Sequence, residues 1–488
     1  MIKTAFIKKI LISLIVFFTT NTLIAQESQT LYYMNRIPQA RYLNPAFAPD
    51  CNIFIGLPTL SSFYFGLGNN RLVLTDIIID HPVKGTPITV FHPDANIDSD
   101  YFSSILKERN YLYDNLSTDI LSFGFRVQDW YFSMNVSEKL DMAVNYPKDL
   151  VKLLLEDPEN YTSLSVDLSS FGFNASLYQE YGFGVSKQIS PKLSVGGKLK
   201  IIGGHVNSKT NYSKNKLKLQ TNMDSLYIEG DATIYTTSPY SAETDEKGNF
   251  DKFNTSSFDV NDALDYALSL QNFGLGIDLG ATYKPINKLL LSASIIDLGY
   301  IKWNEKNVTK LDLKGTHSFR GFDFSEDIAD NDDNGGDNQS FSDITDSIKN
   351  SFDIAPQHES YKTFLSTKIY IGASYYISPK VDFGFLSRTY FYNQSVSQSF
   401  TLSTNVRPIR GVSASLTYSI IDNTFNNLGF GLILGGAPIQ FYIMSDNASV
   451  ALWGHKTNTV NFRFGLNLTF GSYEKKKKSD IPLLESIF

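Results

Sequence analysis

Residues 460–470 read VNFRFGLNLTF, and this stretch decides the predicted fold. The apolar face of the stretch carries Val460, Phe462, Phe464, Leu466, Leu468 and Phe470. Alternation with period two predicts a β-strand, because a helix repeats every 3.6 residues. A tilted strand needs about 9–11 residues to cross a bilayer, whereas a strand of a soluble sandwich usually has about 5–6 residues. The stretch therefore predicts the barrel-closing strand of a membrane barrel, and its aromatic end at Phe470 resembles the last strand of outer-membrane barrels.

Upstream, the chain repeats a unit of strand, short proline-containing turn and strand. The turn prolines are Pro191, Pro285, Pro379, Pro408 and Pro438. Proline cannot donate to a ladder, so it marks connections rather than strands. We expect an all-β fold, a transmembrane antiparallel β-barrel of about 14 strands over residues 52–470. Bacterial barrels have even strand numbers, so 12 and 16 strands are the alternatives.

The connections between these hairpins are predicted to be long and polar. They comprise residues 80–118, 244–266 and 304–362, and a short helix is expected at 147–158. Barrels keep their short turns on the periplasmic side. The long segments should then be extracellular loops.

The first 25 residues have the pattern of a secretory signal peptide. Basic residues precede the apolar run at 10–18, and Ala25 provides a small residue at the expected cleavage point. The alternative is a retained anchor, but the run is shorter than the ~20 residues of a spanning helix. Gln26 stands where a lipoprotein would have cysteine, and Cys51 is the single cysteine, so no intramolecular disulfide can form.

Composition favours the lipid of a bacterial outer membrane as the partner. No stretch after residue 25 is long and apolar enough for a spanning helix, yet the chain has 28 Tyr and 36 Phe. Strands in which only every second residue faces lipid explain both the low hydropathy of each segment and the many aromatic residues. The sequence has 43 basic and 50 acidic residues. Without Lys3, Lys8 and Lys9 the balance is 40 against 50, a net charge of −10, which argues against nucleic acid as a partner.

Residues 26–51 precede the first strand and form an aromatic arm with little charge. The candidate plug residues in this arm are Asn44, Pro45, Ala46 and Phe47. Asn-Pro initiates a turn, and the small alanine permits close packing. A barrel of 14 strands has a lumen wider than side chains alone would fill. We favour a plug in the periplasmic mouth over a plain surface arm.

Several motifs together resemble an uncharacterised family of Bacteroidota outer-membrane barrels, described as a domain of unknown function. The resemblance covers nearly all of the mature region, and its motifs are Leu31–Asn35, Asn44–Ala46, Gly276–Gly280, Phe425–Gly431, Pro438–Tyr442 and Ser445–Asn447. Asn44-Pro45-Ala46 also resembles the opening of fatty-acid-transporter-like barrels and of the PorP/SprF barrels associated with type IX secretion. The resemblance implies a barrel and its compartment, and it implies no activity.

Enzyme signatures are absent, so we expect neither an enzyme nor a cofactor. The six histidines form no His-Glu-x-x-His pattern, and no phosphate-binding glycine loop occurs. Asp330–Gly335 resembles the start of a calcium loop, but Phe341 stands where the bidentate Glu belongs. An acidic surface loop is the better interpretation, and we expect no metal. Residues 471–488 are expected to form a periplasmic tail.

Two functions remain open. The first is a plugged channel or transporter for small or hydrophobic ligands. The second is a structural or accessory barrel of a secretion or envelope complex, with a protein partner. A lumen lined by apolar residues with a lateral gap would favour the first, and a tightly filled lumen with apolar patches on the loops would favour the second.

Overall fold

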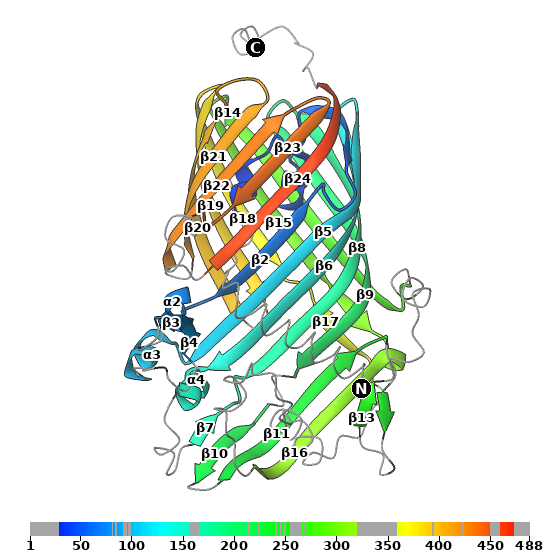
Figure 1. Ribbon diagram of the computed structural model, residues 1–488. Helices are drawn as coiled ribbons and strands as arrows, with labels where there is room; N and C mark the ends of the chain where they lie inside the picture. The colour runs from blue at the N-terminus through cyan, green and yellow to red at the C-terminus, as the bar shows by residue number, and fades with distance from the viewer. Residues whose placement is uncertain are drawn as a thin grey trace.

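The computed structural model describes residues 29–472 apart from internal gaps, the largest at 156–164, 254–265, 320–358 and 449–458. These residues form a closed antiparallel barrel of 14 strands, which confirms the predicted fold class (Figure 1). The wall strands are, in order, β1 (Cys51–Gly56) with β2 (Phe63–Asn69), β5 (Arg109–Val127), β6 (Trp130–Pro147), β8 (Gly172–Ser190), β9 (Leu193–Thr210), β14 (Asn272–Ile286), β15 (Leu289–Trp303), β17 (Tyr361–Phe364) with β18 (Lys368–Ser378), β19 (Val381–Tyr392), β20 (Ser395–Val406), β21 (Val412–Ile421), β22 (Thr424–Gly435), β23 (Ile439–Ser445) and β24 (Thr459–Ser472).

The first and last strands close the barrel. β24 pairs with both halves of the split first strand, with Ile53 opposite Phe470 and Phe63 opposite Phe464. The apolar residues of β24 lie on its outward face, and the polar face, including Asn461 and Asn467, is buried inside. The outward residues Phe462, Phe464, Leu466, Leu468 and Phe470 are the ones that the sequence assigns to the barrel-closing strand.

The wall is apolar outside and polar inside. Large exposed side chains such as Leu279, Ile371 and Leu402 face outward, while Thr401 and Asn427 are fully buried. This distribution of apolar and polar side chains is the reverse of that in a soluble protein, and it is typical of a barrel whose outer face contacts lipid. Of the described helices, none has the length and apolar character to span a membrane.

The two ends of the barrel differ. One end carries short turns, including those at residues 191–192, 287–288 and 379–380, and the five predicted proline hairpins meet there (Figure 1). The other end carries α2 (Leu74–Ile77), α3 (Ser99–Ile105), α4 (Lys148–Leu155), β3 (Ile78–Asp80), β4 (Pro87–Thr89), β7 (Ser165–Asp167), β10 (Lys218–Asn222), β11 (Ser225–Thr237), β12 (Ala242–Thr244), β13 (Phe250–Phe253), η4 (Glu305–Asn307) and β16 (Val308–Phe319). The helix α4 lies where the sequence predicts one.

Two of the predicted loops contain residues that form strands. Residues 80–118 were expected to be one excursion, but β5 already begins at Arg109. Residues 304–362 were expected to be a polar loop, but β16 pairs with β11 in a ribbon beyond the wall. Lys310 and Asp312 make β16 look like a loop, because a strand outside the membrane needs no apolar face.

The first wall strand is interrupted between β1 and β2. Residues 57–62 leave the regular ladder, and Thr59 has a φ of 60°. The Thr59 amide donates to the Asp119 carbonyl at 2.8 Å, and the Leu466 amide donates to the Leu60 carbonyl at 2.8 Å. The wall therefore stays bonded to both neighbours, while Ser61 and Ser62 are buried on the inside.

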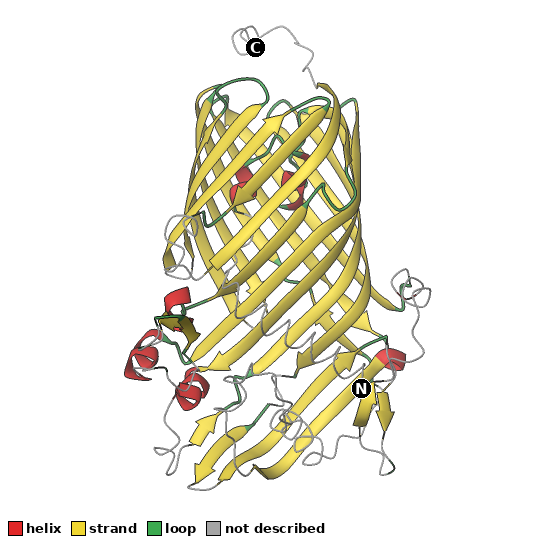
Figure 2. Ribbon diagram, viewed as in Figure 1, coloured by secondary structure: helices red, strands yellow, loops and turns green. Residues whose placement is uncertain are grey.

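The N-terminal residues 29–49, here called the arm, lie inside the barrel. They form the 3₁₀ helices η1 (Thr30–Tyr33) and η2 (Pro38–Tyr42), which Figure 2 shows in the interior of the barrel near the short turns. The main apolar cluster joins arm residues such as Leu31 and Ile37 to wall residues such as Leu386 and Tyr442. The core of this protein is thus the contact between arm and wall.

Candidate functional site

The arm begins at the inner wall near β21 and β23. The amides of Gln29 and Thr30 donate to the Asp446 carboxylate at 3.0 and 2.6 Å. The Thr30 hydroxyl lies 2.8 Å from that of Thr417. All four residues are buried, and bonds to a buried carboxylate are stronger than neutral ones. Asp446 therefore anchors the start of the arm.

Aromatic packing holds the middle of the arm. The Tyr32 ring stacks on Tyr370 with centroids 5.5 Å apart and meets Phe47 edge to face at 5.0 Å. The Tyr32 hydroxyl donates to Ser292 at 3.0 Å. Aromatic pairs in these geometries add about 0.5–1.5 kcal/mol beyond their burial.

Asn44 and Pro45 pack directly against the inner face of the wall. Asn44 Nδ2 donates to the Ala293 carbonyl at 3.3 Å, and Asn44 Oδ1 accepts from the Ala46 amide at 3.0 Å. A Cβ at Gly196 would overlap the Pro45 carbonyl, and a Cβ at Gly280 would overlap the Asn44 side chain. Glycine in the middle of a strand often marks such a close approach of another backbone.

Gln39 and Arg41 bind two further parts of the wall. Gln39 Nε2 donates to the Ser61 carbonyl at 3.0 Å and to Asn467 Oδ1 at 2.8 Å. Arg41 donates to the Ser186 hydroxyl at 3.0 Å, and its guanidinium lies 4.7 Å from the centroid of the Tyr131 ring. Gln39 thus links the arm to the interruption in the first strand and to the last strand.

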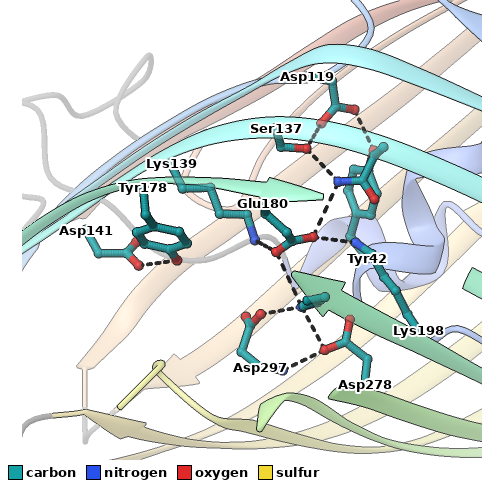
Figure 3. Close-up of polar contacts among 12 residues, drawn as sticks. Tyr42, Asp119, Ser137, Lys139, Asp141, Tyr178, Glu180, Lys198, Asp278 and Asp297 are labelled. Atoms are coloured by element: carbon teal, nitrogen blue, oxygen red, sulfur yellow. Dashed lines mark hydrogen bonds and ion pairs between the residues drawn. The ribbon is translucent and has the colours of Figure 1, made fainter. Parts of the chain in front are cut away.

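Tyr42 links the arm to a set of buried charges. Its hydroxyl donates to Asp119 at 2.5 Å, and Lys198 Nζ lies 4.9 Å from its ring centroid. Asp119 also accepts from Ser137 at 2.7 Å. Figure 3 shows Tyr42 at the edge of the charged group, facing Asp119.

The buried charges form a network across β6, β8, β9, β14, β15 and β18. We call it the ionic network, and its members are Lys139, Glu180, Lys198, Lys200, Asp278, Asp297 and Lys368. Glu180 binds Lys139 at 2.6 Å and Lys198 at 2.7 Å, and Lys200 lies between Asp278 at 2.7 Å and Asp297. Lys368 binds the other oxygen of Asp297 at 2.9 Å. Figure 3 shows the side chains of Lys139, Glu180, Lys198, Asp278 and Asp297 pointing toward one another inside the barrel.

Ion pairs among its own members stabilise the ionic network. Glu180, Lys200 and Asp278 are almost completely buried, so each ion depends on its partners to offset its desolvation. Four lysines face three carboxylates, which leaves one excess positive charge. A cavity of about 100 Å³ lies between the arm and this network, and Tyr42, Asp119, Lys139 and Asp297 are part of its lining.

The structure places the four plug candidates together inside the barrel. Asn44, Pro45, Ala46 and Phe47 lie against the wall with Ala46 and Phe47 buried. That these residues act as a plug stays a prediction. The signal peptide, the Asp330–Gly335 loop and the tail after residue 472 lie outside the described residues.

Sequence reasoning missed the ionic network. A signal was present, because Lys198, Lys200 and Glu180 occupy the inward positions of otherwise alternating strands. Which charges meet depends on strand register, and the register between β9 and the distant strand β14 could not be derived from the sequence. Within the described part of the chain, no group of three or more His, Cys, Asp or Glu residues could hold a metal ion.

A family model described as "Family of unknown function (DUF5723)" matches residues 45–446. The chain belongs to this family. The DUF5723 match therefore runs from Pro45, in the arm, to Asp446, which anchors the start of the arm. The expected relation to PorP/SprF barrels and to Bacteroidota stays a prediction.

Comparison with curated proteins gives no match. Three solved structures with a similar fold are the following. The TodX deltaS2S3 mutant monoaromatic hydrocarbon channel has 10% identity and a TM-score of 0.40, covering 92% of this chain and 96% of that one. The Ralstonia pickettii toluene transporter TbuX has 11% identity and a TM-score of 0.38, covering 89% and 94%. A Pseudomonas aeruginosa FadL homologue has 9% identity and a TM-score of 0.36, covering 92% and 99%.

Proposed function

We propose that this protein is a bacterial outer-membrane channel whose internal pathway is closed by the arm. The observation that carries the proposal is the position of residues 29–49, which are largely buried in the lumen and bound to opposite parts of the wall. Thr30 contacts β21, Asn44 contacts β15, and Gln39 contacts β24. An arm that touches both sides of a barrel blocks passage until it moves.

The outer face supports the membrane placement. Side chains such as Phe183, Leu199, Leu298 and Phe385 are between 45% and 52% exposed on the outside of long wall strands. Exposed apolar surface on this scale is stable when lipid covers it. Closed barrels of this kind are the transmembrane strand architecture of bacterial outer membranes.

Away from the apolar cluster that packs against the arm, the inner face is polar, and we expect it to favour small polar solutes over hydrophobic ones. Thr401, Ser415, Thr417 and Ser419 form a buried hydroxyl surface on β20 and β21, and the ionic network covers the opposite wall. An apolar ligand would gain little on such a surface, because polar groups prefer hydrogen-bonding partners. Of the small and the hydrophobic ligands expected from the sequence, we propose the small ones.

A structural or accessory barrel remains the second candidate. The dense bonding of the arm favours it, because Gln29, Gln39 and Asn44 are each buried and hydrogen-bonded inside the barrel. In that case the arm would be a permanent core, and the β11–β16 ribbon beyond the wall would meet a protein partner.

A pair of neighbouring glycines separates the two candidates. Gly196→Val places a side chain where Pro45 now lies, whereas the Cβ of a Gly197→Val variant would have its nearest neighbours 3.7 Å away on the outer face. We expect Gly196→Val to displace the arm and raise the flux of a small sugar into liposomes, and Gly197→Val to leave this flux as it is in wild type. Heat-modifiable migration on gels shows that each variant is folded. A folded Gly196→Val protein with a displaced arm and no flux would favour the structural candidate.

A further inference from the structure

A groove of about 720 Å³ runs along the outer face of the wall, on the opposite side of the wall from the arm residues Asn44 and Pro45. It crosses β8, β9, β14, β15 and β18, and its surface is almost entirely apolar. Ligand pockets commonly have volumes of about 300–1,000 Å³ and apolar walls with a few polar groups. The groove therefore has the size and the chemistry of a binding site.

The groove follows one row of cross-strand neighbours. Successive pairings place these residues side by side: Trp130, Lys187, Val195, Ala281, Ala293 and Ile371. The next row has Gly197 beside Leu279. The small residues Gly197, Ala281 and Ala293 form the floor of the groove. Larger side chains such as Leu279 and Ile371, which are 49% and 59% exposed, form its sides.

One end of the groove is polar and lies near the short turns. Trp130 is the first residue of β6, directly after a turn, and Lys187 is close to the end of β8. Lys187 Nζ lies 4.5 Å from the centroid of the Trp130 ring, and among the described residues no carboxylate forms an ion pair with it. Tryptophan at this level is typical of the interface between headgroups and hydrocarbon. A lysine there provides a cation for a phosphate.

The length of the row matches a lipid chain. Four strand spacings of ~4.8 Å lead from Lys187 on β8 to Ile371 on β18, a path of about 19 Å. One leaflet contributes about half of a ~30 Å hydrocarbon core, or roughly 15 Å. A tilted row of this length can hold one acyl chain from the interface to the middle of the bilayer.

We propose that the groove is a specific site for an anionic phospholipid of the leaflet nearest the short turns. One acyl chain lies over Gly197, Ala281 and Ala293, and the phosphate meets the Lys187 ammonium. The proposal rests on the membrane placement of the barrel, and it does not depend on whether the arm opens.

Native mass spectrometry of the full chain in detergent, with added phosphatidylglycerol or phosphatidylcholine, tests this site. We expect wild type to retain one phosphatidylglycerol and to prefer it over phosphatidylcholine. Gly197→Leu fills the floor of the groove and should weaken retention about tenfold, a loss of about 1.4 kcal/mol. Lys187→Ala should keep the chain contact and remove the preference for the anionic lipid.

Ala414→Leu is the matched control. Ala414 lies on β21, opposite Val406 and Leu432 and far around the barrel from the groove, so its enlargement should change nothing. Equal lipid retention by wild type and Gly197→Leu, or equal losses in Gly197→Leu and Ala414→Leu, would overturn the proposal. A dimer that only Gly197→Leu abolishes would also overturn it, because a second copy would then occupy the groove. These readouts do not involve flux, so they stand apart from the test of the channel.

Discussion

The arm and the ionic network meet at Tyr42, but different forces hold them in the barrel. The arm is bound mostly by neutral hydrogen bonds and aromatic packing, as at Gln39, Asn44 and Tyr32. The network is bound by ion pairs between strands of the wall, as between Glu180 on β8 and Lys198 on β9. Neutral hydrogen bonds contribute about 0.5–1.5 kcal/mol each, whereas breaking one buried ion pair costs about 3–5 kcal/mol.

This difference indicates which part can move. Moving the arm removes the amide donors of Asp446 but breaks none of the ion pairs between wall strands. The network cannot separate without leaving a carboxylate such as Asp278 alone. We therefore interpret the arm as the movable element and the network as fixed wall, and substitutions in each region should differ in size and in kind.

The largest effect should follow from Lys200→Ala. Lys200 lies between Asp278 and Asp297, so its loss leaves buried carboxylates without their cation and should lower the free energy of unfolding by about 3–5 kcal/mol. Urea unfolding monitored by heat-modifiable migration measures this change. Lys192→Ala is the control, because the exposed Lys192 side chain donates to the Pro285 carbonyl in a turn at 3.4 Å. Equal unfolding midpoints for the two variants would show that the network adds little.

Asn44→Ala should loosen the arm without unfolding the wall. It removes the bonds to Ala293 and to the Ala46 amide, and unsatisfied buried partners cost about 1–3 kcal/mol. Hydrogen exchange of residues 29–49 should accelerate accordingly, while exchange in β9 stays slow. Asn304→Ala removes a comparable cap on η4, outside the arm, and should leave exchange of the arm unchanged. Unchanged exchange in Asn44→Ala would mean that Asn44 does not hold the arm.

Tyr42→Phe should have a smaller effect at the junction of the two regions. The substitution removes one bond to Asp119, which still accepts from Ser137, so we expect a loss of about 1 kcal/mol. The expected result is a few-fold faster exchange of η2, measured as for Asn44. Tyr101→Phe, which removes a similar tyrosine–aspartate bond of 2.7 Å outside the barrel, should not affect η2. A collapse of overall stability in Tyr42→Phe would mean that arm and network are one unit.

Arg36→Ala should have the smallest effect. Its ion pair with Asp50 has side chains that are 40% and 64% exposed, and such surface pairs contribute about 0–1 kcal/mol. Exchange of the arm and flux should both match wild type within error. A clear change in exchange or in flux would mean that Arg36 stabilises the bound position of the arm, which its surface ion pair does not explain.

The sequence predicted those features that depend on local alternation. Residues 460–470 alternate with period two, so their strand and its outward face could be derived. The aromatic arm before the first strand could be recognised as a segment to be buried. The network could not, because Asp297 on β15 reaches Lys200 on β9 only through the register of strands that are distant in the sequence. β16 was missed because its polar residues have no lipid to face.

The most direct test of the account combines the arm-displacing substitution with a reversible tether. The hydroxyls of Thr30 and Thr417 are 2.8 Å apart, so cysteines at both positions, with Cys51 replaced by serine, should form a disulfide between arm and wall. In a Gly196→Val background, conductance across a planar bilayer should be low when oxidised and should rise on addition of reductant. Conductance that is the same in both states, with the disulfide verified by mass spectrometry, would contradict the claim that the arm closes the pathway.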